Sequence, residues 1–353
     1  MIKYFSSFVK QPIGAGADKL ISDMQTTIKN SLENEKITHK EYSFGKLSNS
    51  IYLLFPSPYS KYLMFGFLGN PFFCSLPMTI VGIFLFCFVA LKKRVANERF
   101  FVIAVDLIGW QNALWSTEND RLKDRICWSL EKFLEKILLS YVADEIVSIA
   151  DPEFLRKTYG IKKIHDIEFL EYHVNPKPHS FPELDHLKIL YAGDLGGRRG
   201  FDMELMENVL KNLNDNCELW LVTRGLDNVT LDRFKNFRNF HFLGQIPPNE
   251  LDIVSKQCQF GLILYSPKYI YYNLAPPIKL SSYVANGLTV ISTNLHRVKD
   301  LNVKYDFGYV FCEEDLISFL RTLSKDKIKN NSFLAEQIIN ATKFRDELVE
   351  MCR

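Results

Sequence analysis

The chain has 353 residues, of which 47% are hydrophobic, and its 43 basic side chains are balanced by 41 acidic ones. This length favours two domains, and the hydrophobic content excludes disorder as the main state. The net charge of +2 gives no overall basic field, so we expect no nucleic acid partner. The seven cysteines are scattered and form no CxxC pair, which is typical of reduced thiols in a cytoplasmic protein.

Strands and helices alternate in the first half of the chain. The pattern predicts a strand over 3–9, a helix over 18–34, buried strands over 50–58 and 99–106, and a strand followed by a helix over 143–160. Continuously apolar strands between helices are typical of a parallel sheet that helices cover. The sequence therefore predicts an α/β fold.

An apolar segment over 62–91 contains no charged residue. It exceeds the about 20 residues that a membrane-spanning helix needs, but glycines and prolines interrupt it. Its best helical stretch, 78–91, is followed by the basic cluster 92–94, which suits an anionic membrane surface. We favour the interpretation that this segment is a core or membrane-touching element of the first domain. A re-entrant insertion, a full membrane span and peripheral binding to the inner membrane surface stay open.

A polar, proline-rich stretch over 175–186 is typical of a linker. We therefore expect an N-terminal domain over 1–176, a C-terminal domain over 177–330 and a terminal helix over 331–353, for which packing against the first domain is one option. In the C-terminal domain, the pattern predicts strands over 187–195, 217–225, 259–266, 288–293 and 305–311, a further strand from 240, and helices over 202–213, 229–236 and 313–323.

The stretch LYAGDLGGRRGF, residues 190–201, joins a predicted strand to a predicted helix. Gly193 follows the strand, and Arg198 and Arg199 stand among further glycines. Glycine lets backbone N–H groups approach a ligand closely, and Arg binds phosphate through charge-assisted hydrogen bonds. We favour a phosphate site here over a solvated surface loop.

The stretch PPIKLSSYVANGLTVIS, residues 276–292, predicts a short helix, a stop at Gly287 and a strand. Lys279 stands in the first helical turn, where the helix dipole disfavours a cation by about 0.3–1 kcal/mol. A solvated lysine tolerates this cost, but together with the Gly-Arg loop it could clamp a diphosphate from two sides. Because no DxD pair is present to hold a metal, we expect neither a metal nor a cofactor.

Weaker signals stand elsewhere in the chain. Gly14 and Gly16 form a partial GxG, which we interpret as a loop facing a diphosphate or an acceptor. Asp106 ends a predicted strand, so it is either a general base or a turn residue, and Asp18 is a second carboxylate candidate. Tyr271, in the predicted loop YIYYN, suits stacking on a sugar or a base, although packing on the domain explains it equally well.

These motifs resemble GT-B glycosyltransferases, most of all the bacterial branch with the β-1,6-galactofuranosyltransferases and the streptococcal adhesin glucosyltransferase. That branch shows a motif of the type N-P-x-K-x-S-x-Y-x-x-x-x-x-P-V-I. The matching residues are Pro277, Lys279, Ser281, Tyr283, Val290 and Ile291. Pro276 replaces the motif's Asn and Thr289 its second Pro. The likeness reaches motif quality over 188–292 and is looser in the N-terminal half.

The resemblance implies two Rossmann-like domains facing across a cleft, with a UDP-sugar held mainly by the C-terminal one. It implies a glycan, lipid-linked or glycoprotein acceptor on the N-terminal domain. Arg198 and Lys279 would neutralise the leaving diphosphate, and Asp106 would be the base of an inverting transfer. Many relatives carry a ribose-binding Glu where this chain has Ser282, and the branch has His in place of Val105.

These departures leave two alternatives to a glycosyltransferase. One is a non-catalytic GT-B subunit that stabilises a partner transferase. The other is a nucleotide-sugar epimerase, which would need no acceptor. Whether the chain forms a homo-oligomer also stays open.

Overall fold

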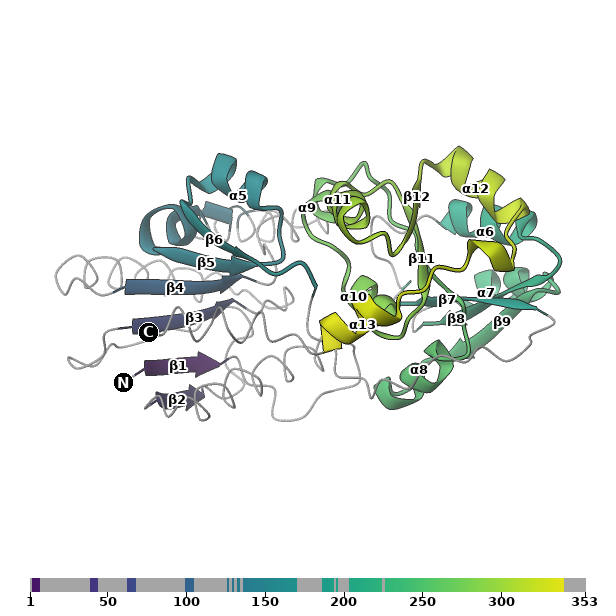
Figure 1. Cartoon of the computed structure of the whole chain (residues 1–353), viewed down its shortest axis with the longest axis horizontal. Coiled ribbons are helices and arrows are strands. Elements are labelled where there is room, and N and C mark those ends of the chain that lie inside the picture. The colour runs from purple at the N-terminus through teal and green to yellow at the C-terminus, as the bar shows by residue number, and fades with distance from the viewer. Residues whose placement is uncertain are drawn as a thin grey trace. The chain divides into compact units, whose positions relative to one another are not determined.

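The computed structural model describes residues 2–6, 39–43, 62–67, 99–104, 126, 129, 132–133, 136–169, 186–193, 195, 203–223 and 226–339. The chain divides into two compact units, one containing β1 to β6 and the other β7 to α13 (Figure 1). Each unit is built on a six-stranded sheet, and all neighbouring strands in both sheets are parallel. The predicted α/β class is confirmed.

The sheet of the first unit has the order β2-β1-β3-β4-β5-β6. Its strands are β1 (Ile2–Ser6), β2 (His39–Ser43), β3 (Tyr62–Phe67), β4 (Arg99–Ala104), β5 (Glu145–Ser148) and β6 (Lys163–Asp166). A π-helical turn, η1 (Leu138–Val142), precedes β5, and α5 (Pro152–Tyr159) connects β5 to β6. The side chain of Asp151 caps α5 by accepting a hydrogen bond from the N–H of Glu153 at 2.8 Å.

The sheet of the second unit has the order β12-β11-β10-β7-β8-β9. Its strands are β7 (Leu187–Ala192), β8 (Cys217–Val222), β9 (Phe240–Gly244), β10 (Phe260–Ile263), β11 (Thr289–Thr293) and β12 (Gly308–Phe311). Its helices are α6 (Met203–Asn212), α7 (Asn228–Lys235), α8 (Pro248–Ser255), α9 (Ile270–Leu274), α10 (Ile278–Ala285), α11 (His296–Tyr305), α12 (Glu313–Arg321), η2 (Lys325–Lys327) and α13 (Ser332–Ile339).

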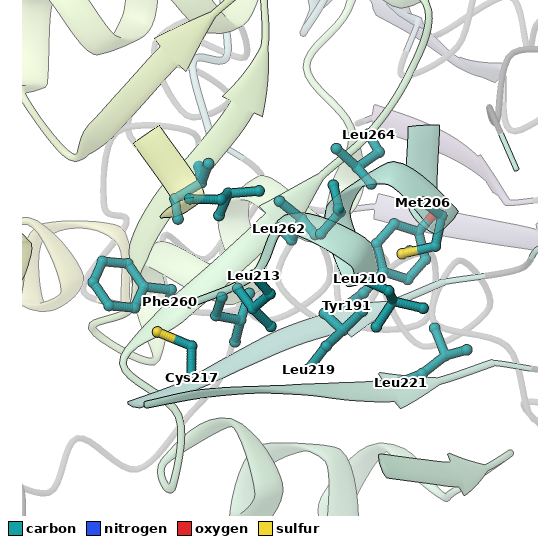
Figure 2. Close-up of a cluster of buried hydrophobic side chains, with 14 of the residues drawn as sticks. Tyr191, Met206, Leu210, Leu213, Cys217, Leu219, Leu221, Phe260, Leu262 and Leu264 are labelled. Atoms are coloured by element: carbon teal, nitrogen blue, oxygen red, sulfur yellow. The ribbon is translucent and has the colours of Figure 1, made fainter. Parts of the chain in front are cut away.

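One face of this second sheet packs against α6 and α12, which lie side by side (Figure 1). Alternate residues of the strands point to this face, among them Tyr191 and Leu262, because side chains in a strand alternate between the two faces. Met206 and Leu210 of α6, one helical turn apart, meet them in the core (Figure 2). Burial of this apolar surface is the main force that holds the unit together.

The opposite face of the sheet carries α10, fixed by Tyr283. The hydroxyl of Tyr283 accepts a hydrogen bond from the N–H of Ala192 at 2.8 Å and donates one to the carbonyl of Leu262 at 3.3 Å. Its ring crosses Gly261, where an added Cβ would lie 2.4 Å from ring atoms. α10 is therefore tied to β7 and β10 at once, and α13 packs against it.

Replacing Gly261 by alanine is expected to destabilise the second unit by about 1–3 kcal/mol, because the new methyl group overpacks the interior. The Tyr283 ring cannot move away freely, since both of its hydroxyl bonds would break. The midpoint of thermal unfolding measures the effect. A midpoint equal to that of the wild type would show that α10 shifts on the sheet without cost.

Several predicted elements are confirmed and others need correction. The predictions over 202–213, 229–236 and 313–323 correspond to α6, α7 and α12, and that over 288–293 to β11. The start of the apolar segment 62–91, residues 62–67, is strand β3, which was not predicted as a strand and pairs with β1 and β4 on either side. The tyrosine stretch predicted as a loop contains the short helix α9.

Like β3 and α9, the elements β2, β6 and α11 and the turns η1 and η2 were not predicted from the sequence. The predicted elements over 18–34, 50–58 and 78–91, and most of the linker 175–186, lie outside the described residues. The described start of the predicted terminal helix 331–353 is α13. Among the helices that the structure describes, none has the length and apolarity needed to cross a membrane.

Candidate functional site

The strand order of the second sheet reverses direction between β7 and β10. The chain proceeds from β7 outward to β8 and β9, and then returns to build β10, β11 and β12 on the other side. In open α/β sheets with this order, ligands bind beyond the carboxyl ends of the strands at such a reversal. The segments that follow Ala192 and Ile263 therefore define where a ligand would bind this unit.

The backbone that leaves β7 is held against its neighbour β8. The N–H of Gly193 donates to the carbonyl of Val222 at 3.0 Å, and the N–H of Leu195 donates to the hydroxyl of Thr223 at 3.2 Å. A Cβ added to Gly193 would lie 2.7 Å from Nζ of Lys279. Glycine at this position thus leaves room for the end of the lysine side chain.

Helix α10 begins beside this edge of the sheet with Pro277 as its N-cap, and the side chain of Pro277 makes no capping hydrogen bond. The N-terminus of a helix carries a partial positive charge, because its first N–H groups have no partner within the helix. Lys279 adds to this first turn an amine that is cationic when it is protonated. The two together favour a negatively charged ligand.

The end of the Lys279 side chain is enclosed, although its stem stays partly exposed. Nζ is closed to solvent and has no hydrogen-bond partner among the described residues. It lies 3.8 Å from the ring centroid of Tyr191 and 4.8 Å from that of Tyr265. Loss of hydration lowers the pKa of Lys279 to about 7. An enclosed amine without an acceptor is costly, so the arrangement is typical of a site whose counter-ion is a ligand.

The second ring over Lys279 belongs to an aromatic group that extends along α9. The backbone N–H of Tyr265 donates to the hydroxyl of Thr293 at 3.3 Å, and that hydroxyl donates to the Tyr265 carbonyl at 2.6 Å. The rings of Tyr265 and Tyr272 stack, with centroids 4.3 Å apart and planes at 12°. Tyr271 meets Tyr272 edge-on at 5.6 Å. The aromatic group thus connects the lysine to the partly exposed Tyr271.

The structure brings some of the predicted site residues together. Lys279 and Gly193 are in contact, and Tyr271 joins them through two other tyrosines. Ser282 lies on α10 at 7% exposure, and its carbonyl accepts a hydrogen bond from the side-chain amide of Asn286 at 3.0 Å. The remaining predicted residues, Gly14, Gly16, Asp18, Asp106, Arg198 and Arg199, lie outside the described residues.

Sequence reasoning did not identify Tyr191 and Tyr265 as parts of the site. Both stand at the carboxyl end of a buried strand, in YAG and LYS, which is the signal that could have found them. Alternation along β7 predicts only that Tyr191 shares the core face with Ile189. The approach of Lys279 to its ring depends on where α10 lies on the sheet.

No family model matches the chain, and no curated protein matches it in sequence. Solved structures do match. WaaG, described as a glycosyltransferase involved in lipopolysaccharide biosynthesis, is 14% identical over 98% of this chain and 93% of its own, with a TM-score of 0.53. WaaB, a lipopolysaccharide outer core galactosyltransferase, is 11% identical over 100% of this chain and 99% of its own, with a TM-score of 0.58.

A third match is Alr3699/HepE of Anabaena, solved with UDP and glucose. It is 11% identical over 99% of this chain and 98% of its own, with a TM-score of 0.57. Identities this low establish the fold alone. The chain therefore has the GT-B fold with parallel Rossmann-like sheets, as the resemblance of its motifs predicted.

Proposed function

We propose that the chain is a GT-B glycosyltransferase that moves a sugar from a nucleoside diphosphate donor, a UDP-sugar, to a glycan acceptor. The observation that carries the proposal is the enclosed Nζ of Lys279, which has no acceptor among the described residues and lies at the strand-order reversal. A diphosphate supplies the missing negative charge. HepE, a protein of the same fold, was solved in complex with UDP and glucose.

In the proposed reaction, an acceptor hydroxyl attacks the anomeric carbon of the donor while the bond from that carbon to the diphosphate oxygen breaks. Lys279 and the N-terminus of α10 stabilise the negative charge that develops on the leaving UDP. We expect Arg198 and Arg199 of the Gly-rich segment to bind the same diphosphate, which is the basis for proposing a transfer without a metal. If the transfer inverts the anomeric configuration, Asp106 takes the proton of the acceptor hydroxyl. If the transfer retains that configuration, the leaving phosphate takes the proton.

The acceptor belongs to the synthesis of a surface polysaccharide or glycoprotein. Two observations support this setting. The motif around Lys279 resembles the galactofuranosyltransferase and adhesin glucosyltransferase branch, and WaaG is described as acting in lipopolysaccharide biosynthesis. A lipid-linked acceptor would place the protein at the inner membrane surface.

A non-catalytic GT-B subunit is the second candidate, and Ser282 is the observation that favours it. Many proteins of the resembling fold carry a ribose-binding Glu at this position, although the galactofuranosyltransferase branch also lacks it, whereas Ser282 is short and mostly buried on α10. A subunit that only stabilises a partner would retain the fold without the donor contact.

Release of UDP, measured with a panel of UDP-sugars and glycan acceptors, tests the proposal. We expect at least one donor to give UDP only when an acceptor is present. Conversion of the donor sugar into its epimer without UDP release would identify an epimerase. If calorimetry shows that UDP does not bind, the non-catalytic subunit would be the remaining candidate function.

A further inference from the structure

We propose that above neutral pH the donor diphosphate binds together with a proton, because the free protein then holds the enclosed Lys279 mostly as a neutral amine and the complex holds it as an ammonium ion. The inference rests on the proposed function, since it takes a nucleoside diphosphate as the ligand of α10. It adds a chemical requirement to that function. One proton enters the site with the donor and leaves it with UDP.

The surroundings of Nζ contain no described group that would keep it charged. The strands under α10, β10 and β11, carry no titratable side chain. Two tyrosine rings lie beside Nζ, those of Tyr191 and Tyr265, and the second of them stacks on Tyr272. Tyr283 on α10 itself donates its hydroxyl to a backbone carbonyl. The titratable residues of the other packed elements are Lys188 of β7, whose Nζ lies over Trp220, and the exposed Glu336 of α13.

The faces of two aromatic rings stabilise a cation less than a neighbouring carboxylate group would. A cation–π contact contributes about 0.5–2 kcal/mol, which does not offset the loss of hydration of an enclosed ammonium. Burial accordingly lowers the pKa of Lys279 to about 7. Above that pH the free protein holds mostly the neutral form, for which an enclosed position between rings costs less than it does for the ammonium form.

A bound diphosphate reverses this balance, because an opposite charge nearby favours the charged form and raises the pKa of the amine. Lys279 is partly exposed and stands in the first turn of α10, so an anion bound at the start of this helix would lie close to it. Between the pKa of the free protein and the higher pKa of the complex, the complex therefore holds more protons. Affinity falls as the pH rises through this window, by up to tenfold for each pH unit, and is independent of this group below it.

Calorimetry of UDP binding in two buffers with different ionisation enthalpies measures the proton directly. At pH 8 the terminal phosphate of UDP, whose second pKa is about 6, is already ionised and contributes little. With a pKa of about 7 in the free protein, we expect an uptake of between about half a proton and one proton for each UDP bound. From pH 7.5 to 8.5 the affinity should fall by about three- to tenfold.

Two variants identify the side chain that takes up the proton. Lys279→Arg keeps its charge at every pH in this range, so it should bind UDP without proton uptake. Lys188→Met is the matched control, because this lysine of the same unit also lies over an aromatic ring, 4.1 Å from the centroid of Trp220. It should take up the same proton as the wild type. If Lys279→Arg does not fold, Lys279→Met should show weak binding without uptake.

Each outcome decides between the two claims. UDP that binds the wild type without proton uptake and with pH-independent affinity would overturn this inference and leave the proposed function intact. Undiminished uptake by Lys279→Arg would also overturn it, since another group would then receive the proton. Absence of UDP binding to the wild type would instead remove the proposed function.

Discussion

Replacing Lys279 by methionine is expected to weaken UDP binding by about 10- to 150-fold and to raise the thermal stability of the free protein. Hydrogen bonds to charged groups contribute about 1.5–3 kcal/mol, which corresponds to this loss of affinity. The gain in stability arises because Nζ is enclosed without an acceptor among the described residues. Burial of an unpaired polar group costs about 1–3 kcal/mol. Methionine has a similar length, and its sulfur packs favourably on aromatic rings such as Tyr191.

The gain in stability should depend on pH with a defined sign. The pKa of Lys279 is about 7 in the folded protein and near its ordinary value of 10.5 in the unfolded chain. The unfolded chain therefore holds more protons between these values, so the lysine destabilises the fold most at and below pH 7 and progressively less as the pH approaches 10.5. The difference in unfolding midpoint between Lys279→Met and the wild type should be largest at pH 7 and shrink toward pH 10.

Lys188→Met serves as the control here too. Its lysine is stacked on Trp220 away from the carboxyl edge of the sheet, so UDP affinity should stay that of the wild type. An unchanged UDP affinity in Lys279→Met would remove Lys279 from the site. A lower unfolding midpoint would show that the lysine has a stabilising partner, in which case its role in the free protein differs from the one argued above.

Helices with a clear apolar period were predicted from the sequence, and polar edge strands were not. In α6, buried Leu205, Met206, Val209 and Leu210 repeat at helical spacing, which is the signal that periodicity detects. By contrast, β6 has the sequence KIHD and β2 has HKEYS, and each lies at an edge of its sheet. Edge strands are short and polar because one side of them has no neighbouring strand, so they lack the continuous apolar run of central strands.

The candidate site was only partly predictable for a related reason. Lys279 was identified because a lysine in a first helical turn opposes the helix dipole, which is a local property of the sequence. Its aromatic surroundings depend on where α10 lies on the sheet. That position is set by the bond from Ala192 to the hydroxyl of Tyr283, between residues separated by 91 positions in the chain. No periodicity within one element carries this information.

The largest expected effect belongs to Asp106, which lies outside the described residues and follows the central strand β4 of the first sheet. The carboxyl ends of parallel strands are where this class of fold places its functional side chains. We propose that Asp106 deprotonates the acceptor hydroxyl, so Asp106→Asn preserves shape and hydrogen bonding but removes the base. A general base contributes about 10²–10⁴-fold, and an inverting enzyme should lose about that much turnover.

The variant should still bind UDP with the affinity of the wild type, because the proposed donor contacts lie in the second unit. Turnover, UDP affinity and the anomeric configuration of the product, measured together for Asp106→Asn, separate the alternatives. A much smaller loss with retained configuration would indicate that the leaving phosphate accepts the proton. Near-normal turnover with inverted configuration would make Asp106 a turn residue. Asp18→Asn, made in parallel, would then test the second carboxylate as the base.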